Sequence, residues 1–420
     1  MAPLNIWILQ TGEPLHSDGP GARPMRAINL ANALVDAGHN VVLWSSTFYH
    51  QEKSHRLTNG NDLVVSPSLH IRLIDSPGYI RNIGFGRLWD HYVLARNLGK
   101  RLRAISELPD VAFIGYPPIE TAYVMSKWLS KNSVPYILDV KDQWPEIFVN
   151  PLPTFLKPLG RLMLWPYFYF GRQAMKNASG ISAMASGFLD WAVSFAGRTR
   201  NKSDYVVPLT TPIGSNSEEE LISAGKWWDE KNVFVDQAFR VSFIGSHTTA
   251  FDMDPVWTAA AELMRCGANV QFVICGDGPC SEEWRRKASG LNNVIFPGWV
   301  DQAKISSLYA RSNLGLAPYK NTKDFVMSIP NKVIDILSAG LPLLSSLNGE
   351  VKKLIDDQGV GFFYDENGAS LQDVIHPLLE NSARIQLSSN NAHSLYRSQF
   401  SYEEVYGNLV KNLEAMAIKD

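Results

Sequence analysis

The chain has 420 residues, more than one ordinary domain holds, so we expect two domains. Hydrophobic residues make up 45% and charged residues 19%, which predicts a large packed core and excludes wholesale disorder. The net charge of −2 excludes a general nucleic-acid binder, because such a protein needs a basic surface.

The three cysteines, Cys266, Cys275 and Cys280, lie in one short region and indicate neither a disulfide framework nor a zinc site. Cys275 lies within an apolar run, so we expect a small buried side chain there. The apolar residues 1–10 lack a basic start and are too few for a signal peptide. The cysteine pattern fits a reducing cytoplasm, where we expect the protein to be located. Since no window reaches about 18 uninterrupted apolar residues, we predict no transmembrane helix.

The first half alternates predicted strands with helices. Residues 4–9 read as a buried strand and lead into a loop that contains Gly12, Gly19 and Gly21. A helix follows, with apolar residues at 28, 31, 34 and 35, and Gly38 ends it. Further strands are predicted at 40–44, 71–74, 111–114, 136–140, 180–183 and 205–207. This alternation predicts a parallel sheet with helices on both faces.

The alternation stops over residues 210–232, where Pro212, Gly214 and the acidic run 218–220 predict a linker and then a solvent-exposed helix. It resumes with strands predicted at 239–244, 270–275, 294–296, 314–317, 343–346 and 361–364, and a closing helix at 402–417. We therefore expect an α/β protein with two Rossmann-like, doubly wound domains, 1–208 and 209–399, and helix 400–420 packing back on the first. The carboxyl ends of both sets of strands would face a central cleft.

The most informative segment, residues 328–342, reads as a loop, a short helix, a glycine stop and a buried strand. Pro330 suits the first helical turn and Gly340 suits a left-handed stop. The start of such a helix offers free N–H groups to an anion, Lys332 adds a full charge, and Asp335 lies on the same face. One cation for phosphate and one carboxylate for sugar hydroxyls suit a nucleotide-sugar site. A surface helix with an ordinary ion pair is the alternative.

Three glycine-containing loops, residues 244–248, 275–279 and 297–300, each follow a predicted strand of the second half. Glycine is needed where backbone and ligand approach closely, although turns also use glycine for purely structural reasons. Together with the helix at 330–335, the three loops form a specific constellation.

On these and similar motifs the chain resembles glycosyltransferase family 4, whose members are retaining enzymes of the GT-B fold. Within that family it is similar to bacterial transferases of surface-polysaccharide biosynthesis that build lipid-linked glycans. The resemblance covers nearly the whole chain. The motifs are Gly-Pro-Gly-Ala-Arg at 19–23, Gly-His-Asn-Val-Val at 38–42, Asp-Val-Lys-Asp-Gln-Trp-Pro-Glu at 139–146, Cys-Gly-Asp-Gly-Pro at 275–279, Phe-Pro-Gly-Trp at 296–299, and Pro-Asn-Lys at 330–332 with Gly-Leu-Pro at 340–342.

The resemblance implies that the second half binds a sugar nucleotide and the first half binds the acceptor. Lys332 would contact the diphosphate and Asp335 the ribose, while Asp142 would face the transferred sugar. Asp142 would position or polarise it, or act as a general base; alternatively, Asp142 and Trp144 only shape a turn. The implied donor-binding residues are Gly19, Gly21, Gly245, His247, Gly278, Trp299, Val300, Pro330, Asn331, Lys332, Asp335, Gly349 and Glu350, with Asp142 and Lys332 catalytic. No metal or other cofactor is expected.

Two positions depart from the family pattern. The family carries an arginine and a lysine after the first strand of the second half, where this chain has residues 245–252 with His247. His247 would take over part of the phosphate contact, or serve only as a polar filler. The family also pairs two glutamates eight positions apart, whereas this chain has Met327 and Asp335. These departures leave the donor sugar open.

We therefore expect a hexosyl- or N-acetylhexosaminyl-type transferase of lipopolysaccharide or capsule biosynthesis. Its donor would be a UDP-N-acetylated sugar rather than a GDP or dTDP sugar, and its acceptor a glycan or a polyprenyl-diphosphate-linked glycan. A sugar-nucleotide 2-epimerase of the same fold and a non-catalytic carbohydrate-binding partner are the alternatives.

Aromatic and basic residues gather in two segments, residues 79–89 and 155–172. Such mixtures suit the cytoplasmic face of the inner membrane, with rings at the headgroups and cations on anionic lipid. In the second segment we assign Arg161, Trp165 and Arg172 to the membrane or acceptor. The alternative is that these rings pack into the core.

Overall fold

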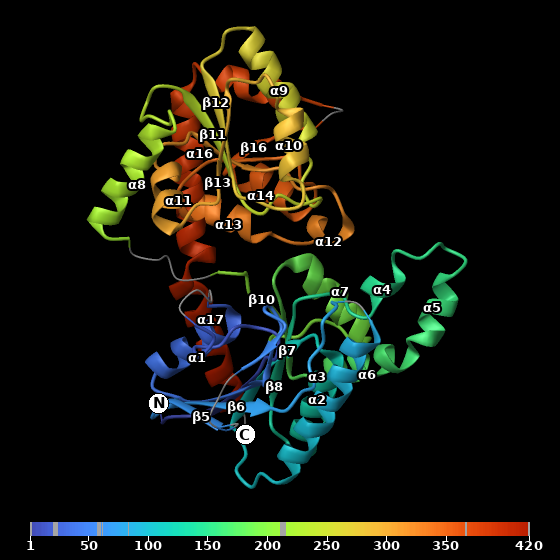
Figure 1. Ribbon diagram of the computed structural model, residues 1–420. Helices are drawn as coiled ribbons and strands as arrows, with labels where there is room; N and C mark the ends of the chain where they lie inside the picture. Colours follow the sequence, from blue (N-terminus) through green and yellow to red (C-terminus); the bar gives the residue numbers. More distant parts are fainter. Residues whose placement is uncertain are drawn as a thin grey trace. The chain divides into compact units, whose positions relative to one another are not determined.

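The computed structural model describes residues 2–19, 24–56, 60, 62–82, 84–210, 216–365 and 368–418. Its contacts divide the chain into two compact units, each seen in Figure 1: unit 1, Met1–Thr211 with Val405–Asp420, and unit 2, Pro212–Glu404. Two hydrogen bonds tie the last helix, α17 (Tyr402–Ala417), to unit 1. His39 Nε2 lies 3.0 Å from Glu414 Oε1, and the Tyr406 hydroxyl donates to the carbonyl of Thr210.

Unit 1 is built on a sheet of eight strands in the order β10-β9-β8-β7-β1-β2-β6-β5. The strands are β1 (Asn5–Leu9), β2 (Asn40–Ser46), β5 (Asp62–Ser66), β6 (Leu69–Ile74), β7 (Val111–Tyr116), β8 (Tyr136–Val140), β9 (Gly180–Ala183) and β10 (Tyr205–Val206). All neighbours are parallel except β5 and β6. The all-parallel prediction is wrong at this edge because only two residues join β5 to β6, a connection too short for parallel strands.

A separate hairpin, β3 (Phe48–Tyr49) and β4 (Ser54–His55), follows β2. Helices flank the sheet of unit 1, and α2, α3 and α6 pack side by side. The helices are α1 (Arg26–Asp36), α2 (Phe85–Arg103), α3 (Ile119–Lys131), α4 (Glu146–Val149), α5 (Lys157–Met163), α6 (Trp165–Lys176), α7 (Ser186–Ala196) and α17. Helix α1 buries Ile28, Ala31 and Leu34, as its periodicity predicts.

Unit 2 contains a fully parallel sheet in the order β13-β12-β11-β14-β15-β16. The strands are β11 (Phe239–Ile244), β12 (Val270–Cys275), β13 (Val294–Gly298), β14 (Leu314–Ala317), β15 (Leu343–Ser345) and β16 (Gly361–Phe363). Each coincides with a predicted strand to within two residues at either end. Numbered along the chain, the order is 3-2-1-4-5-6, the arrangement of dinucleotide-binding domains.

The helices of unit 2 are α8 (Glu218–Glu230), α9 (Asp254–Arg265), α10 (Ser281–Lys287), α11 (Gln302–Tyr309), α12 (Lys323–Val326), α13 (Asn331–Ser338), α14 (Glu350–Gln358), α15 (Leu371–Ile375) and α16 (Ser382–Leu395), with short η1 (His376–Leu378) and η2 (Tyr396–Phe400). The prediction of a solvent-exposed helix is wrong for one side of α8. Trp228 is fully buried and its indole N–H donates to Lys304 O at 2.9 Å, because α8 packs against α11.

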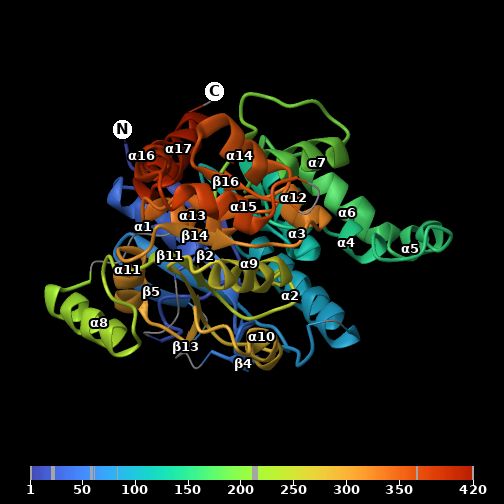
Figure 2. The ribbon, with the colours of Figure 1, turned by 90° about the horizontal axis from the view of Figure 1, so that it is seen from above.

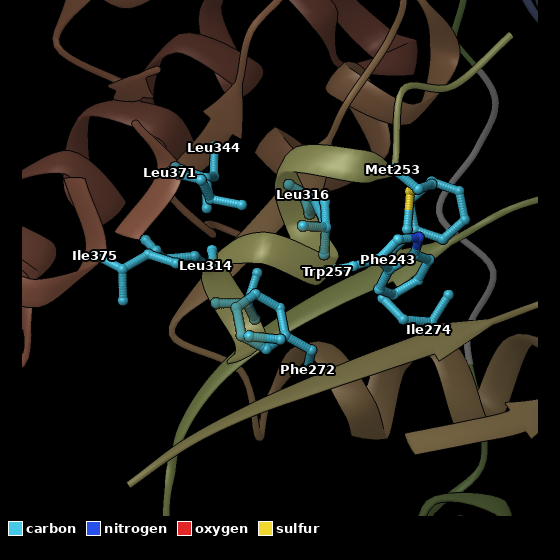
Figure 3. Packing of buried hydrophobic residues seen from close by; sticks show 14 of the residues in the cluster. Phe243, Met253, Trp257, Phe272, Ile274, Leu314, Leu316, Leu344, Leu371 and Ile375 are labelled. Carbon is cyan, nitrogen blue, oxygen red and sulfur yellow. The ribbon is translucent and has the colours of Figure 1, made fainter. Parts of the chain in front are cut away.

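The core of unit 2 fills the space between the sheet and the helices α9 and α15 (Figure 3). Phe243 and Phe272 come from neighbouring central strands, Trp257 from α9 and Ile375 from α15. Cys275 is buried, as predicted. This packing holds the carboxyl ends of β11 and β12 in place and so positions the loops that follow them.

Candidate functional site

In unit 2 the strand order reverses between β11 and β14, and the carboxyl ends of such a pair form the usual ligand crevice of this architecture. Helix α13 follows β14 and begins at Asn331. Pro330 precedes it as the N-cap residue, with φ −65° and ψ 151°, so its predicted place in the first turn is wrong by one residue. The helix start nevertheless lies within one residue of its predicted place, and the first backbone N–H groups of α13 lie there.

The side chain of Lys332 points into the protein and is only 7% exposed. Its Nζ donates to the carbonyl of Ile244, at the end of β11, and lies 4.3 Å from the centroid of the Phe243 ring and 5.3 Å from that of Phe251. Burial lowers the pKa of Lys332 to about 8, while Asp335 and Cys275 act in the opposite direction. An ammonium group with so little water around it gains much from an incoming anion.

Three predicted glycines allow the loops after β11 and β12 to lie against each other and against Lys332. A Cβ atom at Gly245 would collide with Lys332 Nζ, and one at Gly276 would collide with the carbonyl of Gly245. A Cβ atom at Gly278 would lie 2.6 Å from the carbonyl of His247. Contacts within the protein therefore explain these glycines, where the sequence suggested close approach of a ligand.

His247 is fully enclosed by these loops. Its Nδ1 lies 2.9 Å from Ser281 Oγ, its ring lies 4.4 Å from that of Trp284, and its backbone N–H donates to Asp277 O. Nε2 has no hydrogen-bond partner among the residues that the structure describes, and burial lowers the pKa of the ring. This placement favours the structural interpretation of His247 over a contact with phosphate.

The remaining predicted residues of unit 2 lie on the loops after β13 and β15, at the start of α14 and on or next to α13. Trp299 is 75% exposed, whereas Val300 is buried with Trp228 and Leu308. Of this pair, the ring of Trp299 is the group available to stack on a nucleotide base. Gly349 has φ +73° and begins α14 ahead of Glu350, which is partly buried.

Asp335 is partly buried one turn after Lys332. Burial raises the pKa values of Tyr309 and Tyr319, and the negative charge of Asp335 raises them further. The same charge opposes the burial that lowers the pKa of Lys332, so the carboxylate lies within electrostatic range of all three groups. Asn331, at the start of α13, is exposed. The structure thus brings Lys332 and Asp335 together, as their spacing predicts.

In unit 1 Asp142 is half-buried on the loop that follows β8. The backbone N–H of Lys141 donates to Tyr116 O at 2.9 Å, and the Tyr116 hydroxyl donates to Trp144 O at 2.6 Å. Trp144 is itself buried. The residues on both sides of Asp142 are therefore held to the end of β7, which gives its carboxylate a fixed support.

Sequence reasoning missed a buried charged network at the carboxyl ends of β1 and β8. Arg26 donates to Asp139 at 2.7 Å, and Ser182 donates to the same carboxylate oxygen at 2.8 Å. Lys141 pairs with Glu13, which also accepts from the N–H of Ala27. The signal was a charged residue, Asp139, inside the otherwise apolar strand 136–140.

This network holds the loop after β1 against β8. Gly19, within that loop, has φ +102°, a conformation that favours glycine. The predicted Gly21 lies outside the described residues.

The segment that was expected to touch either membrane or core lies on the surface. None of the residues of α5, which the structure describes in full, is buried, and Trp165 is 60% exposed. Arg161 is exposed, and Arg172 Nε donates to Phe195 O at 3.1 Å. In both ribbon views α5 extends away from the sheet of unit 1 (Figures 1 and 2). The core interpretation is wrong for Trp165.

Two features are absent from the described residues. No helix among them is long and apolar enough to span a membrane. In the same ranges, no three His, Cys, Asp or Glu side chains are grouped in a way that could hold a metal ion.

Residues 238–381 match the family model described as glycosyl transferases group 1. This segment holds most of unit 2, including Lys332 and Asp335. The match covers about a third of the chain. A curated relative, the α-D-kanosaminyltransferase of Streptomyces kanamyceticus, is 26% identical over 147 residues, which are 34% of this chain and 37% of the relative. The chain thus matches little more than a third of that relative's length.

Solved structures match along nearly the whole chain. Sucrose-phosphate synthase from Thermosynechococcus elongatus has a TM-score of 0.65 at 14% identity and covers 98% of this chain and 99% of its own. Anabaena HepE in complex with UDP and glucose has a TM-score of 0.61 at 13% identity, over 98% and 100%. WaaG, a glycosyltransferase involved in lipopolysaccharide biosynthesis, has a TM-score of 0.59 at 14% identity, over 97% and 99%. The fold is that of the GT-B glycosyltransferases.

Proposed function

We propose that the protein is a retaining glycosyltransferase, which moves a sugar from a nucleotide sugar to a glycan or polyprenyl-diphosphate-linked acceptor. The observation that carries this proposal is the buried ammonium of Lys332 at the strand reversal of a glycosyl transferases group 1 domain. The nearby carboxylate of Asp335 offers an acceptor for ribose hydroxyls, and the exposed ring of Trp299 offers a surface for the base.

Transfer requires the bond between the sugar and the diphosphate to break while negative charge grows on the departing phosphate. A cation already held in a poorly solvated position stabilises this charge without reorganising, and such preorganised electrostatics is often the largest part of catalysis. Lys332 and the first N–H groups of α13 supply this positive charge. In our proposal the departing phosphate takes the proton of the acceptor hydroxyl, and Asp142 of unit 1 positions the transferred sugar.

For the donor we propose a UDP-N-acetylated sugar, with GDP and dTDP sugars as the competing choices. The solved structure of HepE with UDP and glucose supports a UDP donor by analogy of fold. For the pathway we propose bacterial surface polysaccharide, either lipopolysaccharide or capsule, to which the likeness to WaaG lends support.

A panel of nucleotide sugars tests the proposal in two steps. A true donor should raise the melting temperature, by an amount that corresponds to about 2.7 kcal/mol at a hundredfold excess over its Kd. The protein should then release nucleotide from that donor only when a lipid-diphosphate-linked glycan is present. Conversion of the donor alone would identify an epimerase instead, and binding without turnover on any acceptor would identify a carbohydrate-binding partner.

We also propose that unit 1 attaches peripherally to the cytoplasmic face of the inner membrane. Exposed apolar side chains of Leu162, Met163 and Trp165 support this, with Lys157 and Arg161 close by in the chain. Replacing the three apolar residues by serine should weaken binding to anionic vesicles. The matched control is Leu387→Ser, which removes an equally exposed leucine from unit 2. Equal vesicle binding by the triple variant and the wild type would exclude this attachment.

A further inference from the structure

A second cationic cluster lies in unit 1, away from the loop of Asp142 in the sequence. The turn between β3 and β4 meets the segment between β6 and α2 around the ring of Tyr79. His50 Nδ1 contacts the Tyr79 hydroxyl, and Lys53 Nζ lies 3.0 Å from the same nitrogen. Because β2 and β6 are parallel neighbours, the segments that follow them leave the sheet at its carboxyl edge, where ligands of such sheets bind.

Two cations in this cluster, Lys53 and Arg87, have no anionic partner among the described residues. Lys53 Nζ lies 4.7 Å from the centroid of the Tyr79 ring, and the guanidinium carbon of Arg87 lies 5.6 Å from the same centroid and 4.9 Å from that of Trp144. Arg87 donates one hydrogen bond to Asn82 O, while its buried Nε has no partner in the part of the chain that the structure describes. Within the same ranges, neither cation forms an ion pair with a carboxylate.

In the described part of the chain, the nearby carboxylates of Asp90 and Glu120 form no ion pair with Lys53 or Arg87. Asp90 accepts hydrogen bonds from the Ser76 hydroxyl and from the N–H of Gly78, and Glu120 lies 3.6 Å from His91 Nδ1. They therefore leave the charges of the two cations available.

The positive charges of Lys53 and Arg87 also affect the pKa values of groups in the cluster. The pKa of His50 falls to about 4, first because the ring is buried and then because Lys53 and Arg87 lie near it. Burial and Arg87 also lower the pKa of Lys53. His50 is thus neutral at pH 7, and the site combines two positive charges with aromatic rings.

Apolar side chains continue from these cations into solvent. Ile80 and Phe85 are 89% and 90% exposed, and Trp89 is 60% exposed. They flank Arg87 in the chain, on the segment before α2 and in its first turns. Large apolar groups next to unpaired cations form a surface that suits an anion with an apolar tail.

We propose that Lys53 and Arg87 bind the phosphate groups of an amphipathic acceptor, a lipid-linked diphosphate whose apolar chain lies along Ile80, Phe85 and Trp89. This inference rests on the proposed function, because it assigns the carrier of the acceptor glycan to a defined place in unit 1. Arginine suits such a ligand since its planar guanidinium can donate two hydrogen bonds to phosphate oxygens.

The test measures binding of farnesyl diphosphate, a short soluble probe, to the full chain by titration calorimetry in the absence of any nucleotide sugar. Lys53→Gln and Arg87→Gln should each weaken binding on the order of tenfold, the expected effect of losing one charged hydrogen bond. The matched controls are Lys127→Gln, which removes another lysine that lies over a tyrosine ring, and Arg96→Gln, which removes an exposed arginine of α2. Both controls should bind like the wild type.

Three further probes separate the sources of affinity. Phe85→Ser should weaken binding of farnesyl diphosphate but not of inorganic pyrophosphate, because its exposed ring would contact only the chain. Farnesol should bind more weakly than farnesyl diphosphate, and its affinity should be the same in the Lys53→Gln and Arg87→Gln variants as in the wild type. Unchanged affinity for farnesyl diphosphate in both cation variants would overturn the inference. It would also be overturned if these variants bound anionic phospholipid vesicles more weakly but farnesyl diphosphate as well as the wild type, because the cluster would then be a membrane contact.

The outcomes for site and function are distinguishable. Binding of farnesyl diphosphate needs neither the donor nor turnover. If the protein transfers sugar but the Lys53→Gln and Arg87→Gln variants bind farnesyl diphosphate like the wild type, only this site is refuted. Conversely, cation-dependent probe binding without sugar transfer would refute the proposed function and leave the anion site standing. A melting curve for each single variant confirms that the measured change occurs in folded protein.

Discussion

Replacement of Lys332 by methionine should make the protein more stable and at the same time abolish its response to nucleotide. Methionine has a similar length but carries no charge that must be kept in a buried position. The two effects have opposite signs because the lysine is held in an environment that disfavours its charged form until an anion arrives.

The magnitude follows from the pKa of the buried amine. A fall from 10.5 to about 8 corresponds to a cost of ~3 kcal/mol for keeping Lys332 charged, at about 1.4 kcal/mol per pKa unit. Loss of the hydrogen bond to Ile244 and of the contacts with the Phe243 and Phe251 rings opposes this by about 1–2 kcal/mol. We therefore expect a net gain of roughly 1–2 kcal/mol, which raises the melting temperature of a unit of this size by a few degrees.

The pH dependence of the stability difference between Lys332→Met and the wild type provides a second test. Below pH 8 Lys332 is protonated in both the folded and the unfolded state, so the full cost is present. Between pH 8 and 10.5 the unfolded state binds more protons, and the cost disappears as the pH rises. The stability gain of Lys332→Met should therefore be largest at neutral pH, shrink as the pH rises above 8, and turn into a loss above pH 10.5, where only the lost hydrogen bond and ring contacts remain. Nucleotide diphosphate, by raising the pKa of Lys332, should cause proton uptake when it binds to the wild type near pH 8.

The assay is thermal unfolding at pH 7, with and without UDP or GDP, and titration calorimetry in two buffers of different ionisation enthalpy. Lys352→Met is the matched control, because Lys352 also lies over an aromatic ring, that of Phe363 at 4.6 Å, but is partly exposed and paired with Asp356. A Lys332→Met protein that is less stable than the wild type, and whose melting temperature still rises with nucleotide, would refute the reasoning.

Three other substitutions test separate parts of the site. Gly245→Ala should displace the Lys332 amine and reduce the nucleotide-induced rise in melting temperature; an unchanged rise would show that the amine does not bind the ligand. Trp299→Ala should weaken nucleotide binding by roughly 1–3 kcal/mol in calorimetry without lowering stability, as expected for loss of base stacking on an exposed ring. Asp139→Ala leaves the buried Arg26 without its carboxylate and should cost about 3–5 kcal/mol in urea unfolding, whereas a loss below 1 kcal/mol would contradict the assigned ion pair.

Strand positions in unit 2 could be read from the chain because parallel strands buried on both faces are short apolar runs bounded by turn residues. The strands at 239–244, 270–275 and 314–317 were predicted with their observed bounds. The edge strand β5 was missed, since its partly exposed residues carry no such pattern and only its pairing with β6 defines it.

The candidate site was predictable where chemistry and spacing lie within one segment. The i,i+3 spacing placed Lys332 and Asp335 together, and a loop that follows a strand placed Asp142 at the carboxyl edge of its sheet. The burial of Val300 and His247 could not be read in this way, because it depends on what the neighbouring loops leave open.

The sequence by itself determined the alternation of strands and helices, the start of a helix to within one residue of Asn331, and the cation that this helix carries. These depend on local periodicity and on residues a few positions apart. Only the tertiary structure decided that Lys332 is buried against Ile244 and Phe243, and that Lys53 and Arg87 meet around one ring. The physical reason is that desolvation and charge clustering arise from contacts between residues far apart in the chain, to which local patterns are blind.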